Sequence, residues 1–189
     1  MKSAIQAKYD RLRHFVDTGD IIPIRGKGML SKGILWADKA NYSHALVSYG
    51  THGNRLEAIE SLGHGVTPNF LSLDIEKAED FCIIKPKFSQ EWKDKCFDKY
   101  FKQASKGIPY DWSELLRILL VKKFGAKIKN IQGNPHEAIC SVSAGYLYGH
   151  LLPLKCYEEA YKKQGYLSPQ DLIRFADPKE VTIIGNDYV

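Results

Sequence analysis

A histidine and a cysteine, far apart in the chain, are the two residues whose types could do chemistry together. His44 opens the segment "HALVSYG", and Cys140 lies in "EAICSVSAGYLYG". A thiol attacks a carbonyl as its thiolate, and a nearby imidazole can take the thiol proton and later return it to a leaving group. Such a pair suits an enzyme that transfers an acyl group through a covalent thioester.

The segment around Cys140 predicts a helix rich in small residues, with the cysteine near its start. There the unpaired backbone N–H groups and the helix dipole would stabilise a thiolate and hold a developing oxyanion. A helix that begins near Pro135 would instead place Cys140 more than a turn inside and weaken this effect. The residues alone leave two ordinary structural roles open: a small buried hydrophobic group for Cys140, and a strand histidine bonded to a backbone carbonyl for His44.

Glu57 is the first choice for a carboxylate that orients the imidazole of His44. "RLEAIES" alternates like a strand and follows "THGN", which is typical of a hairpin turn. In that hairpin we expect Glu57 near the position opposite His44 and on the same face, where it would fix the tautomer and stabilise the imidazolium. Glu60 is the alternative, but alternation places it on the other face of the strand.

The elements that must position these residues can be predicted from periodicity and turn signals. Residues 2–17 predict an amphipathic helix, and "DIIPI" a short strand that Pro23 would confine to a sheet edge or a strand end. Residues 25–41 contain three glycines without a clean period, and we expect a long loop that lines a site. "SPQDLIRFA" predicts a helix start capped by Ser168.

The remaining segments predict an α+β fold. Helices are expected over "SQEWKDKCFDKYFKQASKG", "DWSELLRILLVKKF" and "CSVSAGYLYGHLL", and strands over "HALVSY", "RLEAIES", "HGVTP", "DFCIIKP" and "EVTIIG". Because the strands cluster and are joined by hairpins, the sheet should be mainly antiparallel. Nothing in the chain reads as a linker, so we expect one domain over residues 1–189.

Five segments in this order resemble a known family. "GDII", "SHALVSYG", "LEAIESLGHGV", "GIPYDW" and "ICSVSAGYLYG" together resemble the NlpC-type papain-like cysteine peptidase superfamily, in its circularly permuted YiiX/YaeF-like branch. In that branch the histidine strand precedes the cysteine helix. The resemblance covers most of the chain, from about Gly19 to the "SPQDL" helix.

The resemblance implies a permuted papain-like fold with the nucleophile helix packed against the sheet. It implies Cys140 as nucleophile, His44 as general base and Glu57 as the orienting third residue. It also implies that Tyr110 of "PYDW" lies near the active site and contacts substrate, and that Asp111 has a structural role. Two segments follow no pattern of this family: residues 25–41 and the basic stretch 122–129.

The expected activity is hydrolysis of an amide bond in a peptide or a peptidoglycan stem, without metal or cofactor. Two alternatives remain: an acyltransferase or lipid hydrolase of the same superfamily, and a non-catalytic binding protein that keeps the fold. A zinc site is disfavoured because the histidines and Cys140 show no ligand-pair spacing. The sequence leaves the oligomeric state open.

Composition bounds the partners and the compartment. The 189 residues carry a net charge of +5, and the densest basic stretch, "VKKFGAKIKN", reads as a solvated face or a contact for phosphates. No nucleic-acid-binding motif accompanies it, so we expect no nucleic-acid partner.

The longest apolar run, "LLRILLV", falls short of the about 20 residues that span a bilayer. The four cysteines form no CxxC pair, and no signal peptide is visible. We therefore expect a soluble cytoplasmic protein with reduced thiols, of bacterial or phage origin.

Overall fold

The computed structural model describes residues 3–63, 65–95, 98, 112–125 and 154–187. The strands are β1 Ile21–Gly26, β2 His44–His52, β3 Arg55–Leu62, β4 Gly65–Phe70, β5 Ala78–Phe81, β6 Ile83–Pro86 and β7 Val181–Ile184. The helices are α1 Ala4–Leu12, the 3-10 turn η1 Arg13–Phe15, α2 Met29–Asp38, α3 Leu71–Glu76, α5 Trp112–Phe124, α7 Lys155–Gln164 and α8 Asp171–Arg174, with residues 90–95 also helical.

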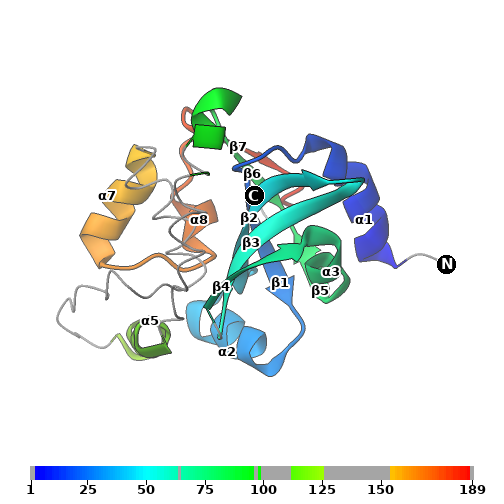
Figure 1. Cartoon of the computed structure of the whole chain (residues 1–189). Helices are drawn as coiled ribbons and strands as arrows, with labels where there is room; N and C mark the ends of the chain where they lie inside the picture. Colours follow the sequence, from blue (N-terminus) through cyan, green and yellow to red (C-terminus); the bar gives the residue numbers. More distant parts are fainter. Residues whose placement is uncertain (1–2, 64, 96–97, 99–111, 126–153, 188–189) are drawn as a thin grey trace.

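One sheet forms the centre of the molecule (Figure 1). Its strands run in the order β4-β3-β2-β1-β6-β7, and β5 pairs with β1 beside β6. Every strand pairing within the described residues is antiparallel. The expected α+β fold with a mainly antiparallel sheet is therefore confirmed, whereas the single domain over residues 1–189 stays a prediction.

Helices cover both faces of the sheet. On one face, Ile22 and Leu46 pack beneath α1 and α3. On the other face, Ile21 and Val47 pack beneath α7 and α8, and Figure 1 shows these helix pairs on opposite sides of the strands. Because both faces are buried, a polar side chain within the sheet must find a partner there.

The β2–β3 hairpin closes as the sequence predicts, but it contains an irregularity. His52 lies opposite Arg55 across a turn in which Gly53 has φ 60°, a value that favours glycine. Further along, the register shifts by one residue between Ser48 and Gly50, which is a β-bulge at Tyr49. Because side chains alternate along a strand, the β2 residues from His44 to Ser48 share a face with different β3 residues than they would in a regular hairpin.

The prediction that Pro23 marks a sheet edge or a strand end is wrong. Pro23 lies in the interior of β1, opposite Ala45 of β2. Its carbonyl oxygen accepts a hydrogen bond from the backbone N–H of Cys82, the residue between β5 and β6. A strand residue directs its N and its C=O toward the same neighbouring strand. The missing N–H of Pro23 therefore faces the junction between β5 and β6, where the ladder is interrupted.

The expected loop over residues 25–41 is also wrong, because Met29–Asp38 forms helix α2. Ile34, Ala37 and Asp38 are its buried residues, and their spacing is helical despite Gly33 in the middle. Lys39 then ends the helix in the left-handed conformation at φ 48°. Tertiary burial of one helix face outweighs the propensity cost of the internal glycine.

A buried group of charges ties α2, α5 and α8 together. Lys122 Nζ lies 2.8 Å from Asp38 Oδ1 and 3.0 Å from Asp171 Oδ1. Asp171 Oδ2 accepts the backbone N–H of Ser168, whose hydroxyl accepts the N–H of Asp171 in return. This reciprocal pair is the capping box predicted for "SPQDL". Burial favours the neutral form of Asp171, but the hydrogen bonds from Ser168 and the charge of Lys122 outweigh this effect. The pKa of Asp171 is therefore lower than usual.

We expect Asp171→Ala to lower the free energy of unfolding by about 3 kcal/mol, because it removes one partner of a buried ion pair and one half of the cap. Urea unfolding at pH 7 measures this. Glu158→Ala is the matched control, since it removes a carboxylate paired with Lys162 on the exposed side of α7 and should cost under about 0.5 kcal/mol. Equal losses of unfolding free energy in the two variants would contradict the stabilising role of Asp171.

Candidate functional site

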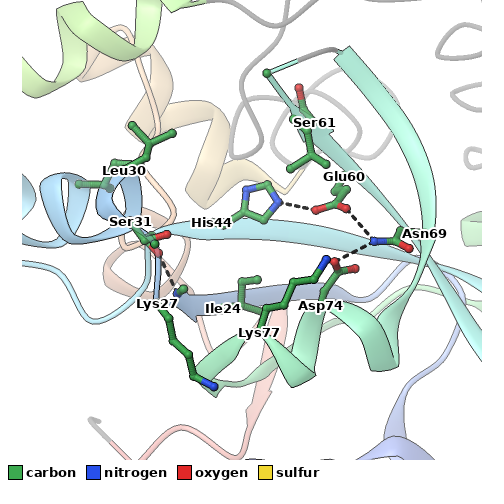
Figure 2. Close-up of a pocket in the computed structure, with 16 residues that line it drawn as sticks. Ile24, Lys27, Leu30, Ser31, His44, Glu60, Ser61, Asn69, Asp74 and Lys77 are labelled. Atoms are coloured by element: carbon green, nitrogen blue, oxygen red, sulfur yellow. Dashed lines mark hydrogen bonds and ion pairs between the residues drawn. The ribbon is translucent and has the colours of Figure 1, made fainter.

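A histidine and a glutamate form a largely buried pair at one end of the sheet. His44 Nε2 lies 2.9 Å from Glu60 Oε2, and the two side chains are 17% and 3% exposed. His44 is the first residue of β2, and Glu60 comes from the neighbouring strand β3. Figure 2 shows the two side chains directed at one another. A carboxylate bonded to one ring nitrogen fixes the imidazole tautomer and stabilises the imidazolium.

The expectation that Glu57 lies opposite His44 is wrong. Glu57 pairs with Gly50, and Glu60 pairs with Leu46, two residues from His44 and on the same face. In a regular hairpin Glu57 would have shared the face of His44, but the bulge at Tyr49 exchanges the faces and brings Glu60 there instead. The catalytic role expected for Glu57 therefore loses the geometry on which it was based.

Behind this pair lies a second carboxyl group, joined to the first by an amide. Asn69 Nδ2 donates to Glu60 Oε1 at 3.2 Å and to Asp74 Oδ1 at 2.9 Å (Figure 2). The Asn69 carbonyl oxygen accepts the backbone N–H of Phe70 at 2.9 Å, which fixes the orientation of the amide. Asp74 is 6% exposed, and its Oδ2 has no hydrogen-bond partner among the residues that the structure describes.

The two carboxyl groups differ in their protonation. Burial opposes the charge of Glu60, but the hydrogen bond and charge of His44 outweigh it, so the pKa of Glu60 is lower than usual. For Asp74, burial and then the negative charge of Glu60 raise the pKa to about 7, against smaller opposing effects of His44, Lys77 and Asn69. Near neutral pH the site therefore holds one carboxylate beside His44 and one carboxyl group that is close to half protonated.

The pair faces a pocket of about 300 Å³. One wall carries the polar residues His44, Glu60, Asn69 and Asp74. The other residues that line the pocket are Ile24, Gly26, Lys27, Gly28, Leu30, Ser31, Ile34, Ser43, Ser61, Leu62, Gly63 and Lys77. A pocket with apolar walls and a few convergent polar groups is the usual form of a small-molecule or peptide-side-chain site.

Two of the predicted site residues lie outside the described residues: Cys140 and Tyr110. The two described cysteines are poor nucleophiles. Burial raises the pKa of Cys82 and of Cys156 to about 12, so both are almost wholly protonated at neutral pH. Within the described part of the chain, no three His, Cys, Asp or Glu side chains gather as metal ligands would.

Sequence reasoning missed Asn69 and Asp74. Asn69 could have been found, because it lies opposite Ala58 in the β3–β4 ladder and therefore shares a face with Glu60. Asp74 follows in α3, a helix of six residues with no strong start signal. Its position depends on how that short helix packs on the sheet, which periodicity does not give.

Comparison with solved structures identifies the fold. No protein-family model matches the chain, and no curated protein matches it significantly. Among solved structures, the crystal structure of the metalloprotein yiiX from Escherichia coli O157:H7 superimposes with a TM-score of 0.60 at 20% sequence identity. The match covers 92% of this chain and 98% of that chain. The chain therefore has a yiiX-like fold.

We expect Asp74→Asn to remove a pH-dependent loss of stability. The folded-state pKa of Asp74, about 7, exceeds the value of about 3.9 for an unfolded aspartate. The folded state thus keeps a proton that the unfolded state has lost, so stability falls as pH rises from about 4 through about 7. Asparagine cannot ionise, so the variant should be more stable than wild type by roughly 2–4 kcal/mol at pH 8 and nearly equal to it at pH 4.

Urea unfolding across this pH range is the measurement. Asp94→Asn is the matched control, because Asp94 is exposed and its substitution should leave the pH dependence unchanged. If wild type and Asp74→Asn lost stability equally between pH 5 and 8, Asp74 would not be the titrating group.

Proposed function

We propose that the protein is a cysteine hydrolase that cleaves an amide bond, with Cys140 as nucleophile, His44 as general base and Glu60 as the orienting carboxylate. The observation that carries the proposal is the His44–Glu60 pair, 2.9 Å apart, on the wall of a pocket. The yiiX-like fold and the resemblance of the sequence to the permuted papain-like branch support Cys140 as the partner.

The proposed reaction has two steps that share one base. The thiol proton of Cys140 passes to His44, the sulfur bonds to the carbonyl carbon, and the C–N bond breaks as His44 gives its proton to the leaving amine. Water then gives a proton to His44 and attacks the thioester, the C–S bond breaks, and the thiolate takes the proton back. Because Nε2 is bonded to Glu60, Nδ1 is the nitrogen that would exchange these protons.

Glu60 replaces Glu57 in this scheme for two reasons. It contacts the imidazole directly, and its lowered pKa keeps it charged at neutral pH, so it can stabilise the imidazolium formed in each step. Asn69 holds the second oxygen of Glu60, which limits rotation of the carboxylate. Residues that orient a base commonly need such support from a further layer of hydrogen bonds.

The substrate we propose is an amide in a peptide or a peptidoglycan stem, recognised in part by Tyr110. The same acyl-thioester chemistry would serve an acyl lipid, and the apolar walls of the pocket at Leu30, Ile34 and Leu62 suit that second candidate. Although yiiX is described as a metalloprotein, the described residues here do not fit a metal centre, because no three ligand side chains gather among them. We assign no step to a metal.

The reactivity of Cys140 toward iodoacetamide should depend on His44 and Glu60. We expect Cys140 to be alkylated quickly well below pH 8, because a thiolate paired with an imidazolium forms at low pH. His44→Ala should abolish this fast alkylation below pH 8. Glu60→Gln should slow it about tenfold or more, since it removes a charge-assisted hydrogen bond from the imidazolium.

Mass-spectrometric mapping of each cysteine against pH measures these rates. Glu57→Gln is the matched control, because it makes the same change on the opposite face of β3 and should leave the rate unchanged. Equal effects of the two glutamate variants would contradict the role of Glu60. If Cys140 reacted no faster than Cys82, the fold would belong to a binding protein without this chemistry.

We expect Cys140→Ala to abolish turnover while the protein stays folded. A panel containing a murein stem tripeptide and a p-nitrophenyl acyl ester provides the assay, and circular dichroism the check on folding. Cys82→Ala and Cys156→Ala should keep activity and lose about 1–2 kcal/mol of stability at most, because they remove only a small buried group. Full activity of Cys140→Ala on any substrate of the panel would exclude the mechanism.

A further inference from the structure

Helix α2 comes from residues 25–41, which the family resemblance leaves unexplained, and the last residues of α5 belong to the basic stretch 122–129, which it also leaves unexplained. The two helices lie side by side at one end of the sheet (Figure 1). Ile34 of α2 packs there with Leu115 and Ile118 of α5, and Tyr166 completes the cluster. The inner sides of both helices are thus buried against one another and the body of the protein.

Their outer sides carry an unusual share of exposed apolar groups. Of the ten large apolar side chains exposed in the described part of the chain, six belong to these two helices. We call this surface the α2–α5 face, made of Met29, Leu30, Trp36, Leu116, Leu120 and Phe124. Met29 is 91% exposed, Phe124 72% and Trp36 63%. Single exposed apolar residues are ordinary, but a cluster of this size on adjoining helices marks a contact surface.

On each helix, two of these apolar groups share one side. On α2, Met29 and Trp36 are seven residues apart and therefore lie on the same side of the helix. On α5, Leu116 and Leu120 are one turn apart in the same way. Lys123 Nζ lies 3.3 Å from the centre of the Trp36 ring, so the exposed sides of the two helices meet.

Lysine side chains border this surface. Lys32 and Lys39 are exposed within and directly after α2, and Lys123 crosses from α5. The acidic residue of α2, Asp38, is buried and paired with Lys122 and Arg174. An apolar surface bordered by lysines complements a lipid bilayer that carries anionic headgroups, because the apolar groups enter the interface while the ammonium groups reach the phosphates.

We propose that the α2–α5 face docks the protein onto an anionic membrane surface. The helices have 10 and 13 residues, too few for the about 20 that cross a bilayer, and they would lie in the interface plane. No helix in the described residues is long and apolar enough to span a membrane. The attraction combines burial of the six apolar side chains with the charge of the lysines.

Docking would bring the pocket to the membrane. Leu30, Ser31 and Ile34 of α2 line the pocket, and Leu30 also belongs to the exposed face. Helix α2 is therefore a shared wall between the pocket and the proposed membrane contact. This inference concerns binding and does not depend on the proposed hydrolase activity.

Vesicle co-sedimentation of the full chain tests the proposal. Vesicles of phosphatidylcholine with phosphatidylglycerol should bind the protein, and vesicles of phosphatidylcholine alone should bind it more weakly. Trp36→Ser/Phe124→Ser should lower the partition coefficient at least about tenfold, because each side chain loses its burial in the interface. Lys32→Gln/Lys123→Gln should lower it about fivefold for each lysine.

Matched controls make the same changes elsewhere. Trp92→Ser/Phe15→Ser removes side chains that are 54% and 52% exposed away from the face. Lys155→Gln/Lys163→Gln removes the same charge from α7, where both lysines are exposed. Both controls should bind nearly as wild type does, and circular dichroism should show all variants folded.

Two results would overturn the proposal. One is the absence of binding to the anionic vesicles, or binding that the face variants and their controls lose equally. The other is a concentration-dependent dimer, seen by analytical ultracentrifugation, that Trp36→Ser/Phe124→Ser abolishes while vesicle binding is absent. That result would identify a second copy of the chain as the occupant of the face.

Discussion

The register of the β2–β3 ladder decides which acidic side chain can reach His44. A bulge of one residue at Tyr49 shifts the pairing, so Glu60 shares the face of His44 and Glu57 turns to the other face. The pocket wall, the Asn69 bridge and the second carboxyl group at Asp74 are all arranged around the position that Glu60 takes as a result. The site thus depends on a backbone irregularity as much as on residue types.

The same wall holds two carboxyl groups, Glu60 and Asp74, and their surroundings favour the charged form of only the first. Glu60 has the imidazole of His44 on one oxygen and the amide of Asn69 on the other. Asp74 shares that amide, but its remaining oxygen has no hydrogen-bond partner in the described part of the chain. Because two buried carboxylates joined by one amide repel each other, the carboxyl group that is paired with the imidazole keeps its charge, and the other is close to half protonated near neutral pH. The division of charge follows from the number of hydrogen-bond donors available to each.

Much of the fold could be predicted from local signals. The hairpin at Gly53, the strands around Ile59 and Ile84 and the cap at Ser168 all rest on short-range turn or alternation patterns, and the structure contains each of them. Helix α2 is hard to predict, because Gly26, Gly28 and Gly33 obscure a burial pattern that only packing against α5 makes decisive. The bulge leaves no signature in composition, and in a regular ladder Glu57 rather than Glu60 would share the face of His44.

The elements of the site wall are also close together along the chain. His44, Glu60, Asn69 and Asp74 fall within two successive hairpins and the short helix that follows them. By contrast, Ile84 of β6 pairs with Ile21 on one side and with Ile183 on the other, so its partners lie near opposite ends of the described chain. Closing long loops costs more entropy than closing hairpins. During folding, the wall that holds the histidine can therefore organise early, while the strands that complete the sheet around it must wait for contacts between distant segments.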